Sequence, residues 1–258
     1  MDNNTLKKHF ESMGARVKFK RTDKRRRWRS APRANSFTID IGHDKQGEYF
    51  EILKGENAPE FELLQSKPKD RHLLLYSTNG QRFLCGHDER HWFVAGIAGA
   101  VSTVSAAKQS LMPTEILEQV KTLPPGEVDN RRNVVFKRQG EWFFIPTQRE
   151  FPETLIHKNE PLQRTAGSKP HICQELYRDG GELVYIVGNK EFTEDEFKKR
   201  KALDPNFDKG GSRIMRRNPR AYARGYVRHE DHATIYLKEW HRVLLNAEFT
   251  NSAVSFLD

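Results

Sequence analysis

Apolar and polar positions alternate along most of this chain, which is the pattern of half-buried β-strands. The segment "SFTIDI" places Phe37, Ile39 and Ile41 on one face. One local theme then recurs: a polar turn, a glycine, Glu or Gln, and a β-branched or aromatic run. Glycine suits the positive φ of tight hairpins, so this theme predicts a meander of antiparallel hairpins. The glycines concerned are Gly47, Gly80, Gly140 and Gly181.

Helical periodicity is confined to a few segments. Apolar residues at spacings of four, three and four predict an amphipathic helix over residues 5–20. These residues are Leu6, Phe10, Met13 and Val17. Shorter helices are expected over residues 101–112, 113–123 and 193–203. The last of these begins with a capping box formed by Thr193 and Glu196.

These patterns together predict an α+β fold that is predominantly antiparallel β, with a few short helices and a basic N-terminal helix and arm. We expect residues 1–36 to form the basic helix and arm, and residues 37–258 to form a β-rich globular domain. A subdivision of that domain is expected near residues 147–170.

Composition narrows the class of protein. The chain has 258 residues, with 36% apolar and 10% aromatic residues, enough for a folded core. The longest apolar run, "FVAGIAGAV", is too short to cross a membrane, and "MDNNTLKKHFESMG" lacks the apolar core of a signal peptide. The two cysteines form no CxxC motif. We therefore expect a cytoplasmic protein with no disulfide scaffold and no membrane partner.

The positive charge is unevenly placed. The net charge is +9, and residues 1–36 carry 12 Lys and Arg against three Asp and Glu, which accounts for the whole excess. Residues 209–228 add seven basic residues and no acidic one. Two basic segments on an otherwise neutral chain favour attachment to a polyanion, with RNA or single-stranded nucleic acid the preferred partner.

The first basic segment contains "RRRWRS", in which a tryptophan lies among arginines. Arginine binds phosphate oxygens through two N–H groups, and tryptophan stacks on unpaired bases. Residues predicted to contact nucleic acid here are Arg25, Arg26, Arg27, Trp28 and Arg29. The alternative is a solvated tail or a localisation signal.

The second basic segment interleaves arginine with tyrosine. Spacing by two residues would line such side chains on one face of a strand, as a track for a single strand or an RNA loop. The predicted contact residues are Arg213, Arg216, Arg217, Arg220, Tyr222, Arg224, Tyr226 and Arg228. The alternative is a loop whose arginines pair with surface carboxylates.

A candidate reaction centre follows directly, at the turn between strands predicted over residues 223–229 and 233–240. His229, Asp231 and His232 are the candidate catalytic group, because histidine and carboxylate together hold a divalent metal or transfer protons near neutral pH. His241 would lie roughly 30 Å from His232 along a straight strand and is expected to belong elsewhere. The alternative is a set of polar residues capping a hairpin.

The segment "HATIYL", which begins at His232, is similar to the H-x-T-h-x-h element of the two-histidine phosphoesterases. Members of that family carry two such elements. The nearest second candidate, "HLLLYS" at residue 72, has Leu74 where the family has a hydroxyl residue.

A second histidine group occurs in "CGHDERHWF". His87 and His91 are candidate metal ligands there, because they share a face in either a strand or a helical turn. If the fold brings this group and the group at His229 together, a shared centre is predicted. If the fold separates them, each is the polar end of a hairpin.

A third polar segment, "SKPHIC", places His171 near Cys173, and a cysteine–histidine nucleophilic pair is one interpretation of it. Because Cys173 lies within an apolar alternation, a buried thiol is the preferred one. The chain has no P-loop, dinucleotide-binding, HExxH or GxSxG motif.

Three functions therefore compete. The first is nucleic-acid binding through the two basic segments. The second is a phosphodiesterase or nuclease, with a divalent metal ion as its expected cofactor. The third is a protein-interaction module whose basic tail contacts an acidic protein partner.

Overall fold

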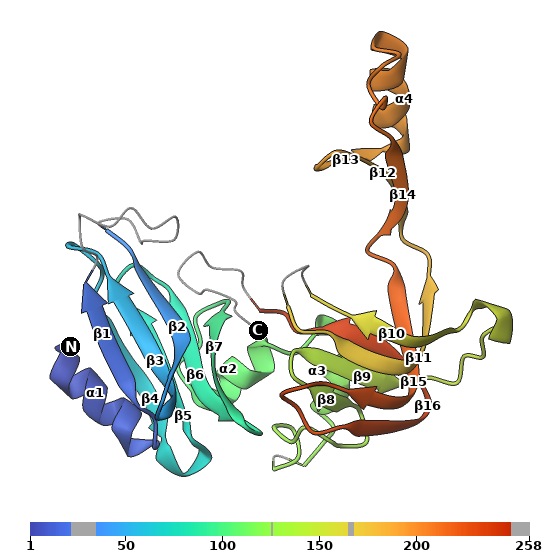
Figure 1. Ribbon diagram of the computed structural model, residues 1–258. Coiled ribbons are helices and arrows are strands. Elements are labelled where there is room, and N and C mark those ends of the chain that lie inside the picture. The colour runs from blue at the N-terminus through green and yellow to red at the C-terminus, as the bar shows by residue number, and fades with distance from the viewer. Residues whose placement is uncertain (22–34, 125, 165–167, 249–258) are drawn as a thin grey trace.

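The computed structural model describes residues 1–21, 35–124, 126–164 and 168–248. Two β-rich halves lie side by side, and an arm projects from the second half (Figure 1). The predicted α+β fold, predominantly antiparallel β with a few short helices, is confirmed. Among the residues described, none of the helices combines the length and apolar character that crossing a bilayer requires.

The N-terminal half consists of a three-stranded sheet, ordered β1-β3-β2, and a four-stranded sheet, ordered β4-β5-β6-β7. Large apolar side chains from both sheets pack into one core, in which the Phe37 ring meets the rings of Phe61 and Phe83 edge-on. The strands are β1 (Val17–Arg21), β2 (Phe37–Asp44), β3 (Gly47–Lys54), β4 (Phe61–Lys67), β5 (His72–Ser77), β6 (Arg82–Asp88) and β7 (His91–Ile97). A 3₁₀ turn, η1 (Pro68–Asp70), joins β4 to β5.

Helix α1 (Asn3–Ser12) packs on this half and fully buries Leu6 and Phe10 in its core. The predicted helix over residues 5–20 is wrong in its second part, because the chain turns at Gly14, whose φ is +83°. The residues after the turn form β1, which pairs in parallel with β3. Val17 remains buried, but as a strand residue. The division at residue 36 and the subdivision near 147–170 stay predictions.

The C-terminal half contains a six-stranded antiparallel sheet, ordered β10-β11-β15-β16-β9-β8. Its strands are β8 (Lys137–Gln139), β9 (Trp142–Pro146), β10 (His157–Leu162), β11 (His171–Asp179), β15 (Arg220–Arg228) and β16 (Ile235–Leu245). Helices α2 (Val104–Ser110) and α3 (Thr114–Val120) connect the halves, and η2 (Glu153–Leu155) precedes β10. Ile116 and Val120 of α3 pack against Phe143 of β9.

The arm is inserted between β11 and β15, which pair directly with each other. It comprises β12 (Glu182–Val187), β13 (Lys190–Thr193), α4 (Glu194–Leu203) and β14 (Ser212–Arg217). The predicted capping box at Thr193 is confirmed. Tyr185 of β12 stacks on Phe197 of α4, which fixes the helix on the strands.

Three of the four hairpins that the glycine pattern predicts are present. Gly47, Gly80 and Gly140 have positive φ at the β2–β3, β5–β6 and β8–β9 turns. Gly181 also has positive φ, but it lies where the chain leaves the sheet for the arm. The prediction of a fourth hairpin is therefore wrong. A turn is present at Gly181, but β11 pairs with β15 and not with β12.

Candidate functional site

A cleft of about 400 Å³ lies between the two halves. The N-terminal half lines it with residues of β2, β3 and β7, and the C-terminal half with Glu141, Lys169 and the turn between β15 and β16. Six of the lining residues described are acidic and three are Lys or Arg. The acidic residues are Asp40, Glu48, Asp88, Glu141, Asp231 and Glu248. This balance favours a cation over an anion as the ligand of the cleft.

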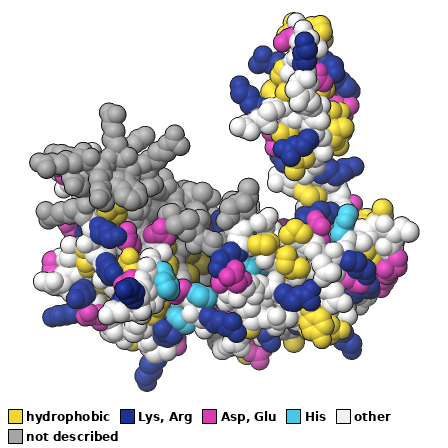
Figure 2. Space-filling view, in the orientation of Figure 1, with side chains coloured by type: hydrophobic (Ala, Val, Ile, Leu, Met, Phe, Trp, Pro, Cys, Tyr) yellow, Lys and Arg dark blue, Asp and Glu magenta, His cyan; other side chains and the backbone are white. Residues whose placement is uncertain are grey.

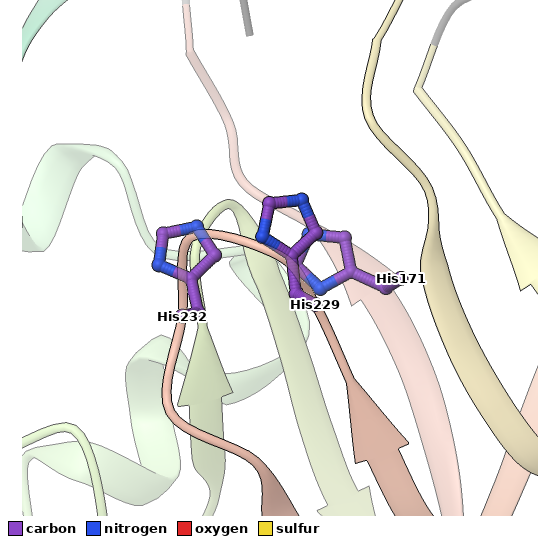
Figure 3. A group of neighbouring side chains, drawn as sticks. All are labelled: His171, His229 and His232. Carbon is purple, nitrogen blue, oxygen red and sulfur yellow. The ribbon is translucent and has the colours of Figure 1, made fainter.

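Three histidines meet at the C-terminal side of the cleft and are called the histidine cluster below. His171 comes from the start of β11, whereas His229 and His232 come from the β15–β16 turn (Figure 3). One ring nitrogen from each lies within 4.8 Å of the others. The nitrogens of a tetrahedral zinc site lie about 3.4 Å apart, so a metal would draw these atoms closer by up to about 1.4 Å. Because the ring planes are within 27° of parallel, the rings would also have to rotate.

The rings are stacked rather than edge-on. The His229 ring lies between the other two, with centroids 4.1 Å from His171 and 4.6 Å from His232. Burial, together with the neighbouring imidazoles, disfavours the protonated forms of His229 and His232. These two rings are therefore suited to the neutral form, in which a ring nitrogen lone pair can bind a metal.

A buried glutamine sets the orientation of His171. The Gln139 side-chain amide donates to the carbonyl oxygens of Val227 and Ala233, which flank the β15–β16 turn. Its Oε1 must then be the acceptor 2.9 Å from Nδ1 of His171. Nδ1 carries the proton in that arrangement, and Nε2 of His171 keeps its lone pair for a ligand.

His232 has a buried ring nitrogen without a hydrogen bond. Its Nδ1 is inaccessible to solvent and has no hydrogen-bond partner among the described residues, and the nearest carboxylate, Glu89, is 3.8 Å away. Burial, together with the neighbouring His229 and His171, lowers the pKa of His232 to about 3. A neutral His232 beside two further imidazoles is suited to bind a metal ion.

His229 is more fully engaged. Its Nδ1 accepts the backbone N–H of Asp231 at 3.1 Å, and its ring also hydrogen-bonds the backbone of Lys169. Burial, then the proximity of His171, lowers the pKa of His229. For His229 to bind a metal ion, one of these two hydrogen bonds must be replaced by the bond to the metal.

The absence of a side chain at Gly140 leaves room for the rings of the histidine cluster. This residue turns the β8–β9 hairpin with φ +57°, and a Cβ atom there would lie 2.8 Å from Nε2 of His232 and 3.3 Å from Cε1 of His171. Its neighbour Glu141 places a carboxylate oxygen 3.7 Å from Nε2 of His171. The hairpin therefore supplies both the room for the rings and a nearby acid.

The N-terminal half holds the turn that carries His232. Glu89, at the β6–β7 turn, accepts the backbone N–H of Ala233 at 2.8 Å. Arg131 forms ion pairs with both Asp88 and Glu89. The hydrogen bond between Glu89 and Ala233 connects the β6–β7 turn to the β15–β16 turn, and Arg131 holds the acidic side chains of the β6–β7 turn.

His91 reaches the cleft from the same side. Its Nδ1 lies 2.5 Å from Glu48, and its Nε2 lies 3.8 Å from Asp231. Asp231 is held by Lys169 at 2.8 Å. His91 is thus brought next to the group at His229, and the shared centre that the sequence predicts for such an arrangement stays a prediction.

The other predicted ligand, His87, lies apart. Its ring packs edge-on against Trp92 and lines a smaller cavity of about 140 Å³ with His72. Neither His87 nor His91 joins the histidine cluster, and their role as metal ligands stays a prediction. His72, from the second phosphoesterase-like element, lines only this smaller cavity, so the two elements do not share a cleft.

The sequence pattern indicates a role for His171 only as a partner of Cys173. Cys173 is fully buried in the core of the C-terminal sheet, and burial raises the pKa of its thiol to about 12. His241 is buried on β16 and does not line the cleft. Gln139 and Glu141 were also missed, although their flanking of a hairpin glycine was a signal that polar groups gather there.

Three of the six arginines of the second basic segment pair with carboxylates. Arg217 binds Glu182 and Glu191, and Arg220 binds Asp179. Arg224 binds Glu175 and Glu153, and Tyr222 is buried. Arg228 is exposed and donates to Asn159, while Arg213 and Arg216 are exposed on the arm, which carries many Lys and Arg side chains (Figure 2).

Of the first basic segment, only part can be placed. Arg25, Arg26, Arg27, Trp28 and Arg29 lie outside the described residues. Before them in the chain, Arg16 and Lys18 pair with Asp44, and Lys20 pairs with Glu51. These earlier cations are therefore engaged within the fold.

Two tyrosines form the main exposed aromatic feature of the C-terminal sheet in the described range. Tyr226 of β15 and Tyr236 of β16 are direct cross-strand partners, with exposures of 49% and 53% and ring centroids 4.9 Å apart. Arg228 and Lys238, two residues further along the same strands, are also exposed. We call this pair and its two cations the tyrosine platform.

Comparison with protein-family models, with curated proteins and with solved structures found no match to this chain.

Proposed function

We propose that this chain is a metal-dependent phosphodiesterase that acts on nucleic acid, with RNA or single-stranded segments as the preferred substrate. The proposal rests on the histidine cluster, in which one ring nitrogen from each of three imidazoles lies within 4.8 Å of the others. Three protein ligands and one open position are the usual arrangement of a catalytic zinc ion.

In this proposal the histidine cluster holds a divalent ion, which would polarise a phosphoryl oxygen and lower the pKa of a bound water. Gln139 accepts from Nδ1 of His171, which would leave Nε2 as the nitrogen able to hold the ion. Glu141, close to the same nitrogen, is placed to accept a proton or complete the ligand set.

The charge of the cleft supports a requirement for metal. Its described lining has twice as many carboxylates as Lys and Arg side chains, and Lys169 and Arg164 are paired with Asp231 and Glu248. A phosphodiester would be repelled by this lining unless a bound cation offset it. Cleavage should therefore be lost when metal is removed.

Nucleic acid as the substrate class is supported by the tyrosine platform. Two exposed rings flanked by Arg228 and Lys238 suit stacked bases with neighbouring phosphates. The strand that carries Tyr226 runs directly into the turn with His229, roughly 10 Å further along the chain. A bound single strand could thus extend from the platform towards the cleft.

Metal content and cleavage test the proposal together. Wild type, His229→Ala and His232→Ala would be dialysed against zinc or manganese, analysed by mass spectrometry for bound metal, and assayed on single-stranded RNA, single-stranded DNA and duplex DNA. His157→Ala is the matched control, because that histidine is exposed on β10, away from the cleft.

We expect wild type and the control to bind one metal and cleave single strands, and both cluster variants to lose metal and activity. Metal binding that is equal in all four proteins would reject the cluster as the site. Metal binding without cleavage of any of the three substrates would reject the phosphodiesterase.

A second candidate function, nucleic-acid binding without cleavage, is favoured by the same platform and by the exposed Arg213 and Arg216. Replacing Tyr226 and Tyr236 with alanine should weaken binding of a single-stranded oligonucleotide at least about 10-fold, since each stacked base contributes about 1–3 kcal/mol. The corresponding phenylalanine double variant keeps both rings and is the control. Equal affinity of all three proteins would remove the platform from binding.

Salt dependence tests the cationic contribution. Replacing Arg213 and Arg216 with serine should reduce the slope of log affinity against log salt by about 1.4, because each phosphate contact on a single strand contributes about 0.7. Lysine at both positions keeps the charge and should keep the slope. An unchanged slope in the serine variant would exclude the arm from the interface.

The N-terminal segment needs a different variant. Deleting residues 1–36 would remove Leu6 and Phe10 from the core and so confound binding with unfolding. Serine substitution of the four arginines in "RRRWR" keeps Leu6 and Phe10 in the chain. We expect this variant to have a flatter salt dependence, and an unchanged one would remove the segment from the mechanism.

A further inference from the structure

The described lining of the cleft contains a carboxylate–imidazole pair that lies outside the histidine cluster. His91, at the start of β7, places Nδ1 2.5 Å from Oε1 of Glu48 on β3. The other oxygen of Glu48 accepts the backbone N–H of Trp92 at 2.9 Å. Both carboxylate oxygens are thus engaged by neighbouring residues of β7, and the carboxylate has a fixed orientation.

This fixed carboxylate orients the imidazole. With Nδ1 of His91 bound to Glu48, the remaining nitrogen, Nε2, lies towards Asp231 at 3.8 Å. Asp231 itself accepts from Lys169 through both of its oxygens, at 2.8 and 3.0 Å. The His91 side chain is 40% exposed, so its outer nitrogen is open to the cleft.

The pair and the histidine cluster face the same space from opposite halves. His91 and Glu48 line the 400 Å³ cleft from the N-terminal half, and His229 and His232 line it from the C-terminal half. The contact between His91 and Asp231 bridges the two, because Asp231 lies between these two cluster residues in the chain. A substrate in the cleft would contact both groups.

We infer that Glu48 and His91 form the proton-transfer pair of this site, with His91 as the catalytic base and acid and Glu48 as its positioning residue. The inference rests on the proposed phosphodiesterase function. A carboxylate fixed on one imidazole nitrogen holds the ring and stabilises the imidazolium formed when the other nitrogen takes up a proton, as in the histidine–carboxylate pairs of hydrolases.

The step is the hydrolysis of a phosphodiester. The oxygen of a water molecule forms a bond to phosphorus, and the bond from phosphorus to the leaving oxygen breaks. The proton released by the water passes to Nε2 of His91 and then to the leaving oxygen. The imidazole returns to its starting state, and no oxidant or reductant is needed.

A purely structural pair is the alternative. Glu48 already connects β3 to β7 through the N–H of Trp92, and the Trp92 ring packs edge-on against Phe50 of β3. If the pair only held these strands together, its removal would reduce stability and leave turnover unchanged. Catalytic and structural roles therefore differ in what they predict for kcat.

The experiment compares wild type, His91→Ala, His91→Gln and Glu48→Gln with the His157→Ala control. Cleavage of a single-stranded oligoribonucleotide would be followed at saturating zinc or manganese, together with bound metal and the melting temperature. His91→Gln keeps a donor to Glu48 without a group that transfers protons, so it serves even if His91→Ala fails to fold.

We expect both His91 variants to lose at least about 100-fold in kcat, with bound metal and KM close to those of wild type. Glu48→Gln should lose less, about 10-fold, because the imidazole remains but is less well oriented. Free imidazole should partly restore His91→Ala, since it can enter the space left by the ring, and it should not restore Glu48→Gln.

Three other outcomes would each overturn the proton-transfer pair. A His91→Gln enzyme with kcat within about twofold of wild type overturns the proton-transfer pair while leaving the metal-dependent phosphodiesterase intact. Loss of bound metal together with kcat assigns His91 to the metal and also overturns the pair. A wild-type protein that binds metal but cleaves nothing overturns the proposed function and the pair with it.

Discussion

Replacing Gly140 with alanine tests whether the three imidazoles act as a metal site. Two costs are expected. The first is backbone strain of about 1–2 kcal/mol, because φ is +57° and left-handed backbone disfavours residues with a Cβ atom. The second is steric, because the new Cβ would lie 2.8 Å from Nε2 of His232, where about 3.5 Å is an ordinary contact.

The two costs are separated by a matched control. Gly188, in the β12–β13 turn, has φ +61°, and no described atom lies within 4 Å of a Cβ built there. Gly188→Ala therefore carries the strain without the contact. Only Gly140→Ala should displace the His232 ring, by roughly 0.7 Å, whereas metal–ligand distances tolerate about 0.2 Å.

The assay is calorimetric titration with zinc, accompanied by urea unfolding in the presence of a chelator. Both variants should unfold at lower urea concentration than wild type, and Gly140→Ala by the larger amount because it carries the steric cost as well. Only Gly140→Ala should lose zinc affinity, at least about 10-fold, which is about 1.4 kcal/mol. Equal zinc affinity in the two variants would refute the metal site as described.

Three further predictions concern the fold. The pKa of His232 is lowered from 6.5 to about 3, so between these pH values the unfolded chain binds a proton that the folded chain does not. The free energy of unfolding should therefore be highest above about pH 6.5 and should fall as the pH decreases towards 3. Urea midpoints at pH 7 and pH 5 check this, and His232→Gln should reduce the difference between them. Cys173, whose pKa burial raises to about 12, should react with iodoacetamide only after unfolding, and rapid labelling of the native protein would contradict its burial. Phe10→Ala should cost about 3–5 kcal/mol of unfolding free energy, against at most about 0.5 for Leu203→Ala, which is 84% exposed; similar urea midpoints would argue against α1 as part of the core.

Local sequence signals predicted the strands and turns well, because they depend on neighbouring residues. Period-two alternation and hairpin glycines identify β2, β3, β5 and β6 without reference to the rest of the chain. The predicted helix over residues 5–20 failed because the apolar spacing continues to Val17, whereas Gly14 already ends the helix. The pairing of β1 with β3 is a tertiary interaction and has no local signal.

The same limit applies to the basic segments. The sequence gives the position of each arginine but not the carboxylate that faces it. Arg217, Arg220 and Arg224 meet acidic side chains that are distant in the chain, which leaves Arg213, Arg216 and Arg228 as the more available cations of the second segment in the described structure. Of the aromatic residues in that segment, Tyr226 is exposed and Tyr222 is buried.

What the sequence determined by itself is the β-rich class, the location of most turns, and the fact that histidines and acids gather at two of them. Those features follow from short-range preferences of the backbone. Only the tertiary structure decided that the two turns face one cleft, that His171 joins His229 and His232, and that Glu48 meets His91. These contacts span as many as 144 positions in the chain, and they form because the two halves lie side by side and bring distant turns to the same cleft.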